Sequence, residues 1–297
     1  FGKVARGSRR QNERSEVKKN STLKPEQYRI NERLIIKQMD TFLFDSIIVG
    51  PIHSRRLGTS LGVNLLAPAS KLCNFNCIYC ECGWNGAHGE GAFNPYGKVI
   101  PALEAKLKTM SEERKLPDVI TFAGNGEPTM HPDFDRIIDA TLALRDRYAP
   151  ATKVAVLSNA TMIDREAVRK ALLRVDRNIL KFDSAIDATM RHINQPRNDR
   201  TVARIIELLQ EFQGCLVVQT MFLRGDYGGH HIDNTTPEEG EAYLDAIRRI
   251  HPSEVMLYTI DRNTPADDLQ KVSYEEMEAI AARIRELDMD IIPSVAR

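Results

Sequence analysis

Four of the five cysteines of the chain lie within ten residues of one another, at Cys73, Cys77, Cys80 and Cys82. The C-x3-C-x2-C spacing of the first three gathers their thiolates on one short loop, close enough to bind a single metal centre. A cubane iron–sulfur cluster that is held by three cysteines leaves one iron without a protein ligand, and this iron can bind a small molecule. The spacing therefore favours an iron–sulfur centre with one open coordination position.

Zinc is the alternative that the same loop allows. Clustered cysteines also bind zinc, and Cys82 or His88 could supply a fourth, tetrahedral ligand. Cys82 lies only two residues beyond Cys80, where the tight C-x-C geometry disfavours a fourth cluster ligand, so we expect it to be a free thiol near the site. Cys215 begins an apolar strand and is interpreted as a small buried hydrophobic residue.

The composition is that of a soluble protein with a sizeable core. The chain has 297 residues, of which 42% are hydrophobic and 28% are charged, and this length allows one large α/β domain or two modest domains. No apolar run approaches the roughly eighteen residues that cross a bilayer, and no signal-peptide pattern opens the chain. Because thiolate ligands need a reducing compartment, we expect a cytoplasmic protein without membrane partners.

The net charge of zero is unevenly distributed. Residues 1–38 carry eleven Lys/Arg against four Asp/Glu, which leaves thirty against thirty-seven for the remainder. We expect this extension to be a mobile basic arm, or sequence upstream of a natural start at Met39, followed by one core domain at 39–297. A basic arm can bind phosphates non-specifically, which keeps RNA open as a partner, although charged tails are usually only solvated.

Short apolar runs alternate with amphipathic helical stretches from about residue 60 onward. Strands are predicted at 61–66, 119–122, 154–157, 178–182, 216–222 and 255–259. Helices are predicted at 99–115, 134–147, 164–173, 201–212, 237–250 and 273–287. Strict alternation requires parallel strands joined by right-handed crossovers. Six units fall short of the eight of a complete TIM barrel, so we predict a three-quarter (β/α)6 barrel, and residues 291–292 are interpreted as the start of a further strand.

The distinctive polar residues follow the carboxyl ends of these predicted strands, where parallel β/α folds carry their functional loops. The cysteine loop follows the first strand. The loops after the second to sixth strands contain 124–127, 158–159, 183–184, 224–231 and 261–262. Convergence of polar side chains on one rim is hard to explain as packing and predicts a functional site there.

Five segments carry a resemblance to a known family. They are the cysteine loop, 50–58 (GPIHSRRLG), 122–129 (FAGNGEPT), 181–183 (KFD) and 193–196 (INQP). The stretch from residue 50 to about 265 resembles the radical S-adenosyl-L-methionine (SAM) superfamily. Within it, the chain is similar to a subgroup of iron–sulfur oxidoreductases related to tRNA wyosine-base synthesis proteins. The resemblance covers over two-thirds of the chain.

The resemblance implies two cofactors, a [4Fe–4S] cluster on Cys73, Cys77 and Cys80, and SAM, whose amino and carboxylate groups bind the open iron. Tyr79 would offer its ring to the adenine, and Gly124 and Gly126 would let the backbone pass close to the ligand. Backbone carbonyls and Glu127 would accept hydrogen bonds from the SAM ammonium group. Loop packing and a plain tight turn are the structural alternatives.

Four further residues are expected to contact SAM. Asn159, with Ser158, is placed to hydrogen-bond the ribose or the methionine carboxylate, and Asp183 is suited to ribose hydroxyls. Lys181 lies on the same strand face as Asp183 and, if it points inward, needs a partner such as a SAM or substrate carboxylate. For Asn159, Ser158 and Asp183 the alternative is capping of the helix that follows.

The implied activity is reductive cleavage of SAM to a 5′-deoxyadenosyl radical that takes hydrogen from a substrate, with a flavodoxin- or ferredoxin-type electron donor. The alternative is a non-catalytic iron–sulfur or zinc-binding protein that retains the barrel, but the intact SAM-side motifs argue against it. Residues 1–72 contain no cysteine, whereas the wyosine-type proteins use additional N-terminal cysteines. This departure speaks against tRNA as the substrate.

Substrate contacts are expected from the loops after the fifth and sixth strands. The segment 224–231 is rich in glycine and polar groups and is long enough to close over a substrate. Arg224 suits a carboxylate or phosphate, His230 or His231 could handle a proton, and Arg262 extends the argument with less force. The alternative is an ordinary solvated loop with two surface histidines.

Overall fold

The structure is a computed structural model that describes residues 42–54, 56–68, 70–86, 92–287 and 289–296. The chain divides into a unit of residues Phe1–Met39 and a unit of residues Asp40–Arg297, and only the second contains described residues. The predicted basic extension 1–38 and the zinc-ligand candidate His88 lie outside the described residues.

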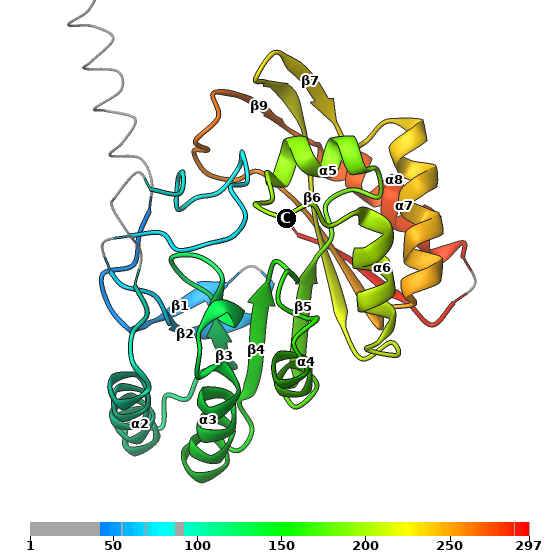
Figure 1. Ribbon diagram of the computed structural model, residues 1–297. Helices are drawn as coiled ribbons and strands as arrows, with labels where there is room; N and C mark the ends of the chain where they lie inside the picture. The colour runs from blue at the N-terminus through cyan, green and yellow to red at the C-terminus, as the bar shows by residue number, and fades with distance from the viewer. Residues whose placement is uncertain (1–41, 55, 69, 87–91, 288, 297) are drawn as a thin grey trace, which may run out of the picture. The chain divides into compact units, whose positions relative to one another are not determined.

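A curved, mostly parallel sheet forms the framework of the second unit (Figure 1). Its order is β1-β2-β3-β4-β5-β6-β8-β10, and every pairing from β2 to β10 is parallel. The strands are β1 (Ile48–Ser54), β2 (Gly58–Val63), β3 (Val119–Phe122), β4 (Lys153–Ser158), β5 (Arg177–Lys181), β6 (Val217–Tyr227), β7 (His230–Asp233), β8 (Glu254–Thr259), β9 (Asp268–Lys271) and β10 (Ile292–Val295). The predicted (β/α)6 partial barrel is confirmed.

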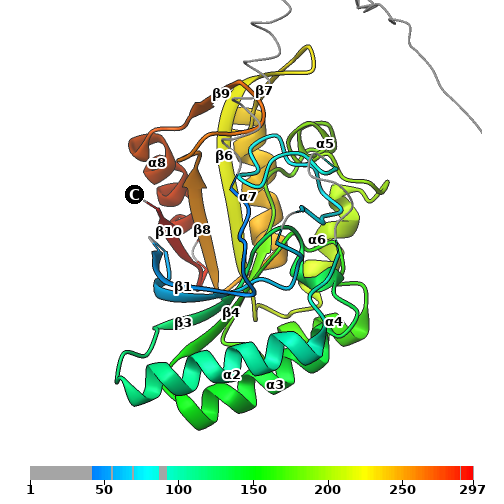
Figure 2. The same cartoon turned by 90° about the vertical axis from the view of Figure 1, so that its left-hand side faces the viewer.

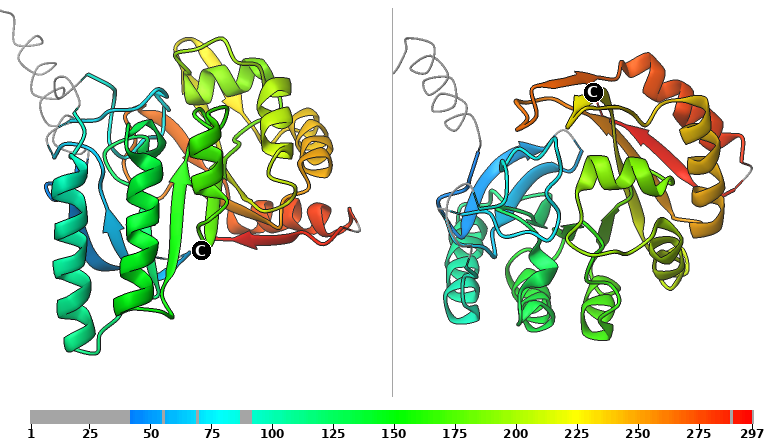
Figure 3. Two further views of the ribbon diagram at one scale, coloured as in Figure 1. Left: turned by 60° about the horizontal axis from the view of Figure 1, so that its bottom comes forward. Right: turned by 45° about the horizontal axis from the view of Figure 1, so that its top comes forward.

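The connecting helices form a layer around the outside of the sheet (Figure 3). They are α2 (Tyr96–Glu112), α3 (Phe134–Tyr148), α4 (Glu166–Leu172), α5 (Asp187–Asn194), α6 (Val202–Gln210), α7 (Pro237–Ile250) and α8 (Tyr274–Arg285), with a short 3-10 turn at Pro128–Met130. Local sequence sets their starts. Thr236 caps α7 ahead of Pro237, and Ser273 and Glu276 form a reciprocal capping box on α8.

An apolar layer closes the inside of the barrel below the strand ends. One side chain from each of five neighbouring strands contributes to it, namely Val119, Ala155, Ile179, Val217 and Met256. Because side chains alternate along a strand, the neighbouring positions point outward into the larger core under the helices. The polar residues near the carboxyl ends of the strands therefore lie on an apolar base.

Two strands differ from the prediction. β1 was not predicted, and it pairs antiparallel with β2 through a bulge between Val49 and Ile52, which disrupts its apolar alternation. β6 continues to Tyr227 and pairs with both β7 and β9, so the expected loop 224–231 is a β-hairpin. The predicted further strand is confirmed, because β10 pairs parallel with β8.

Two local predictions were wrong. Cys215 is exposed instead of buried, because it lies in the turn that precedes β6. Helix α5 was missed in the connection after β5.

No described helix combines the length and the apolar character that a membrane crossing requires.

Candidate active site

The cysteine loop is attached to the glycine-rich turn after β3. The amide of Leu72 donates to the carbonyl of Asn125 at 2.9 Å, and the amide of Glu127 donates to the carbonyl of Leu72 at 3.0 Å. Between these two bonds lies Gly126, at φ +144°. A Cβ at this position would lie 1.9 Å from the Leu72 carbonyl oxygen, so only glycine allows this approach.

The other side of the loop pairs with the segment that ends α5. The amides of Asn76 and Ile78 donate to the carbonyls of Asn194 and Ile193 at 2.9 and 3.0 Å. The side-chain nitrogen of Asn194 lies 3.5 Å from the sulfur of Cys77 and 2.6 Å from Asp183 Oδ2. The INQP segment therefore holds the cysteine loop and contacts one thiol directly.

Asn159, which follows β4, contacts the thiol of the first cysteine as Asn194 contacts that of the second. Its Nδ2 lies 3.4 Å from the sulfur of Cys73 and donates to Asn74 Oδ1 at 2.8 Å. Its Oδ1 accepts from the amide and hydroxyl of Thr161. The alternative role, capping of the helix that follows, is wrong, because the N-cap of α4 is Arg165 and the Asn159 side chain bonds to Thr161 instead. The contact of Asn159 with SAM stays a prediction.

Glu127 is the centre of a buried network between β3 and β4. Its carboxylate accepts hydrogen bonds from the amide and hydroxyl of Thr129, from the Ser158 hydroxyl at 2.8 Å and from the Asn159 amide at 2.6 Å. Burial raises the pKa of Glu127 above its usual value, while these hydrogen bonds oppose the increase. Glu127 positions Ser158 and Asn159 at the end of β4, and it also lines the cavity described below.

Lys181, at the end of β5, lies between two tyrosine rings. Its ammonium is 5.0 Å from the Tyr79 ring centre and 5.5 Å from that of Tyr258, and it donates to the Tyr258 hydroxyl at 2.9 Å. Burial by itself lowers the pKa of Lys181, but the Asp183 carboxylate at 3.7 Å and the Tyr258 hydroxyl raise it above its usual value. Lys181 is therefore a charged group in the cavity.

Asp183 has a different position from the one predicted. Its carboxylate is fully buried and accepts from the Tyr79 hydroxyl, from Asn194 Nδ2 and from the amide of Met221 at 2.9 Å. It does not line the cavity around the thiols. The geometry gives it the task of fixing Tyr79 and Asn194 instead of the predicted contact with a ribose.

The donor set around the thiols fits an anionic iron–sulfur cluster. Lys71, only 4% exposed, donates to the carbonyl of Gly83 at 2.7 Å. Burial lowers the pKa of Lys71, but the nearby thiols of Cys80, Cys73 and Cys77 raise it above its usual value, so a buried cation faces the three cysteines. N–H groups of Phe75, Asn159 and Asn194 also point at the sulfurs of Cys73 and Cys77. Such donors stabilise thiolates that bind metal.

The four loop thiols differ in acidity. Burial raises the pKa of Cys73 and raises that of Cys77 to about 11. The pKa of Cys80 is lowered to about 5 by a hydrogen bond from the Cys82 thiol and by the Lys71 ammonium. The Cys82 sulfur also lies 3.4 Å from the Gly124 carbonyl oxygen, and the bond to Cys80 raises its pKa. Cys82 is therefore a thiol with a raised pKa beside Cys80.

One open cavity of ≈290 Å³ joins the thiols to the strand ends. Most of the predicted site residues line it: Cys73, Cys77, Cys80, Tyr79, Gly124, Gly126, Glu127, Ser158, Asn159, Lys181 and Arg262. Arg262 is exposed and pairs with Glu81, another lining residue, at 2.7 Å. Among the described residues, no three His, Cys, Asp or Glu side chains converge as a single metal ion requires.

Three predicted substrate residues lie outside this cavity. The Arg224 guanidinium pairs with Glu276 of α8 at 2.8 Å and with Thr235 at 2.6 Å. His231 pairs with Asp226 at 2.9 Å, and the His230 ring lies 4.2 Å from that of His192. All three residues belong to the paired strands of the β6–β7 hairpin, and the partners named here lie outside the lining of the thiol cavity.

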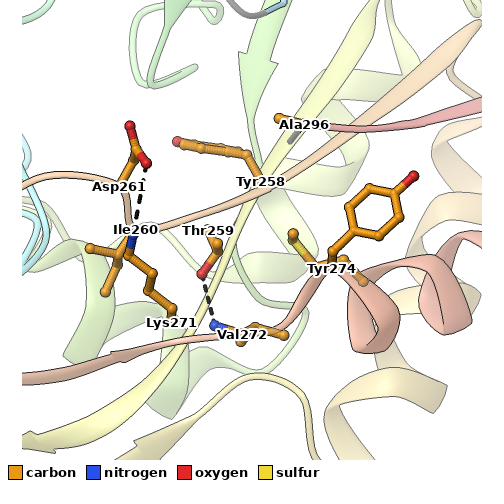
Figure 4. Close-up of a pocket in the computed structure, with 9 residues that line it drawn as sticks. Tyr258, Thr259, Ile260, Asp261, Lys271, Val272, Tyr274 and Ala296 are labelled. Carbon is orange, nitrogen blue, oxygen red and sulfur yellow. Dashed lines mark hydrogen bonds and ion pairs between the residues drawn. The ribbon is translucent and has the colours of Figure 1, made fainter.

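A second cavity, of ≈480 Å³, lies at the end of β8 (Figure 4). Its lining includes Val272, Tyr274 and Met277, and it shares Tyr258, Thr259, Ile260 and Asp261 with the thiol cavity. The Asp261–Lys271 ion pair, at 3.7 Å, and a hydrogen bond from the Val272 amide to the Thr259 hydroxyl hold β8 against β9 here. The two cavities thus meet at the end of β8.

The comparison with protein families identifies this arrangement. A family model described as the radical SAM superfamily matches residues 68–230, which is more than half of the chain. The chain belongs to the radical SAM superfamily. The predicted family is confirmed, and so are its two cofactors, since the superfamily uses a [4Fe–4S] cluster and SAM.

Curated relatives of this radical SAM protein include a UPF0026 protein of Synechocystis sp., 31% identical over 222 residues, which cover 73% of this chain and 77% of that protein. The UPF0026 protein MJ1312 of Methanocaldococcus jannaschii is 31% identical over 184 residues, or 60% and 54% of the two chains. A GTPase Obg of Brachyspira hyodysenteriae is 29% identical over 235 residues, or 78% and 32%. The chain thus spans about half and about a third of the lengths of the last two.

Solved structures share the fold at low identity. A radical SAM methyltransferase from Sphaerobacter thermophilus has a TM-score of 0.60 at 15% identity, covering 80% of this chain and 66% of that one. Streptococcus suis SuiB bound to S-adenosylmethionine has a TM-score of 0.54 at 13% identity, covering 76% and 48%. Both support the partial barrel and carry no information on the substrate.

Proposed function

We propose that Cys73, Cys77 and Cys80 hold a [4Fe–4S] cluster and that the protein uses it with SAM to remove hydrogen from a substrate. When bound and reduced, these cofactors supply a 5′-deoxyadenosyl radical. The observation that carries the proposal is the single cavity into which three thiols, the turn after β3 and the residues after β4 and β5 all open. The chain supplies ligands, orientation and exclusion of water.

SAM recognition is assigned to residues that line this cavity. The turn at Gly124–Glu127 offers carbonyl and carboxylate oxygens for the SAM ammonium group, and Gly126 keeps that turn against the cysteine loop. Ser158 and Asn159 face the methionine carboxylate or ribose. The Tyr79 ring, fixed by its hydroxyl bond to Asp183, faces the adenine. Asp183 acts through Tyr79 and is a positioning residue.

Three statements about the context of the reaction belong to the same proposal. The cluster takes its electron from a flavodoxin- or ferredoxin-type donor, as radical SAM enzymes generally require a reductant. The protein works in the cytoplasm, because thiolate ligands need a reducing compartment. Residues 1–72 lack the additional cysteines that the wyosine-type proteins use, which disfavours tRNA as the substrate.

The test is anaerobic reconstitution with iron and sulfide, followed by dithionite and SAM, with detection of 5′-deoxyadenosine by mass spectrometry. The wild-type protein is expected to form 5′-deoxyadenosine, and Cys77→Ala is expected to form none. Cys215→Ala is the matched control, because this cysteine is exposed and far from the loop in sequence. Full cluster loading without any 5′-deoxyadenosine would support the non-catalytic alternative instead.

A further inference from the structure

We propose that Arg56 binds an oxyanion group, a carboxylate or a phosphate, on the substrate of this protein. The proposal deepens the proposed function and rests on it, because it concerns the same cavity. Arg56 belongs to the segment 50–58, one of the segments that carry the family resemblance, and the assignments above give this segment no role in binding the cluster or SAM.

Arg56 reaches the cavity from an unexpected direction. It lies in the turn between β1 and β2, at one edge of the sheet, whereas Tyr258 lies on β8 near the other edge. The Arg56 guanidinium carbon is nevertheless 4.6 Å from the centre of the Tyr258 ring. The hairpin of β1 and β2 therefore brings Arg56 across the open side of the partial barrel, where the two sheet edges approach each other (Figure 2).

One nitrogen of the Arg56 guanidinium is left without a partner among the described residues. Its Nη1 atom is buried and has no hydrogen-bond partner among the described residues. By contrast, Arg262, which lines the same cavity, pairs with Glu81, and Arg224 pairs with Glu276. A buried guanidinium N–H without an acceptor is costly, so an oxyanion in the cavity would remove an existing penalty.

A second cation, Lys181, adds positive charge at the same end of the cavity. The Lys181 ammonium also lies over the Tyr258 ring and donates to its hydroxyl, so one ring carries two cations. The only described carboxylate paired with Lys181 is that of Asp183, which lies at 3.7 Å and outside the cavity lining. Two cations beside one ring favour an anion between them.

The position separates this group from the SAM contacts. The residues assigned to SAM lie in the cysteine loop, in the turn after β3 and at the end of β4, whereas Arg56 and Tyr258 belong to the β1–β2 turn and to β8. A planar guanidinium stacked on a ring presents its N–H fork in a fixed plane, which matches the two oxygens of a carboxylate or phosphate. Such a contact would orient the substrate relative to the thiol end of the cavity.

The experiment uses the full chain, reconstituted with its cluster and saturated with SAM but without reductant. The probes are inorganic phosphate and 13C-labelled acetate at constant ionic strength, and their binding is measured by NMR line broadening. Wild-type protein is expected to broaden at least one probe, and the probe that responds distinguishes phosphate from carboxylate. Arg56→Gln is expected to weaken that binding at least tenfold, and Arg56→Lys is expected to give an intermediate value.

The matched control is Arg136→Gln, because Arg136 also stacks on a tyrosine, at 4.7 Å from the Tyr96 ring, but lies on the outside of α3. It is expected to bind the probes as the wild type does. If Arg56→Gln loses its cluster, probe binding by Arg56→Lys is compared with that of the wild type instead. Equal binding by wild type and the Arg56 variants, or absence of binding by the wild type, overturns the proposal.

Two further readings on the same samples separate this proposal from others. If the probes bind without SAM but are displaced by it, Arg56 recognises the SAM carboxylate and the proposal is wrong. Reduction of the same samples with dithionite tests the proposed function separately. If the probes bind in an Arg56-dependent way but no 5′-deoxyadenosine forms, the oxyanion site is supported and the proposed radical reaction is refuted. If 5′-deoxyadenosine forms but the probes do not bind, only the oxyanion site is refuted.

Discussion

Gly126 and Leu72 approach each other so closely that a Cβ on Gly126 would lie 1.9 Å from the Leu72 carbonyl oxygen. This contact joins the turn after β3 to the residue before the first cysteine. Gly126→Ala must therefore push the two segments apart and also place alanine at φ +144°. We expect a loss of more than about 2 kcal/mol in the free energy of unfolding and a large fall in iron content after reconstitution.

The control for this variant is Gly97→Ala, near the start of α2, where an added Cβ meets nothing within 4 Å. Its free energy of unfolding should change by less than about 1 kcal/mol, because alanine is the better helix former. Urea unfolding of the metal-free proteins and iron analysis of the reconstituted ones measure both effects. Normal iron loading by Gly126→Ala would show that the cluster loop tolerates displacement from this turn.

The role of Cys82 gives a second prediction. Replacement of Cys73, Cys77 or Cys80 by alanine should abolish the brown chromophore, because each removes one of only three ligands. Cys82→Ala should retain about four irons and four sulfides per chain, because Cys82 is not one of the three proposed ligands and its thiol lies 3.4 Å from the Gly124 carbonyl oxygen. Iron and sulfide analysis and EPR of the reduced cluster are the measurements. A colourless Cys82→Ala protein would indicate a closed four-cysteine site.

The strands and helices of the barrel were predictable because their signals are local. The alternation of apolar runs gave the six β/α units and β10, whose boundaries agree with the structure to within a few residues at most ends. The exceptions lie where local signals conflict with tertiary pairing. A bulge interrupts the pattern of β1, and the polar residues of 224–227 are strand only because β7 and β9 pair with them.

In the candidate site too, local features were predictable and contacts between distant segments were not. Three cysteines in one loop are visible in the sequence, but contacts between distant segments are not. Asn194 reaches the Cys77 thiol across a separation of 117 residues, and the sequence identified its segment only through the family resemblance. The burial of Lys71 was not predicted either. Its position two residues before Cys73 is the only feature of the sequence that points to a role near the thiols. Arg224 was expected at the substrate site, but it does not line the thiol cavity, and its partner Glu276 lies on the separate helix α8.

Asn194 is the basis of a third prediction. Its side chain bridges the Cys77 sulfur and the buried Asp183 carboxylate, so Asn194→Ala removes a donor to a cluster ligand and leaves that carboxylate with one partner fewer. We expect cluster loss to an iron chelator to become about 10- to 100-fold faster. Asn198→Ala, outside the thiol cavity, is the control and should behave as the wild type does. Equal rates for all three proteins would show that the bridge has no influence on the cluster.

The Arg224–Glu276 pair gives the last prediction, which concerns pH. A hydrogen bond from the Arg224 guanidinium lowers the pKa of Glu276 from 4.5 to about 2 in the folded protein. A carboxyl group with a lowered pKa stabilises the fold above its unfolded-state pKa, and this contribution disappears as the pH falls through the folded value. Arg224→Ala should therefore cost less than about 1 kcal/mol at pH 7, because the pair is exposed.

The difference in the free energy of unfolding between wild type and Arg224→Ala should shrink as the pH falls from about 4.5 to about 2, as measured by urea unfolding across this range. Arg204→Ala, which removes an exposed pair on α6, is the control for general charge effects. SAM cleavage at pH 7 should be unchanged in both variants, because neither arginine lines the thiol cavity. A selective loss of cleavage in Arg224→Ala would instead return the β6–β7 hairpin to the active site, as a segment that closes over the cavity during turnover.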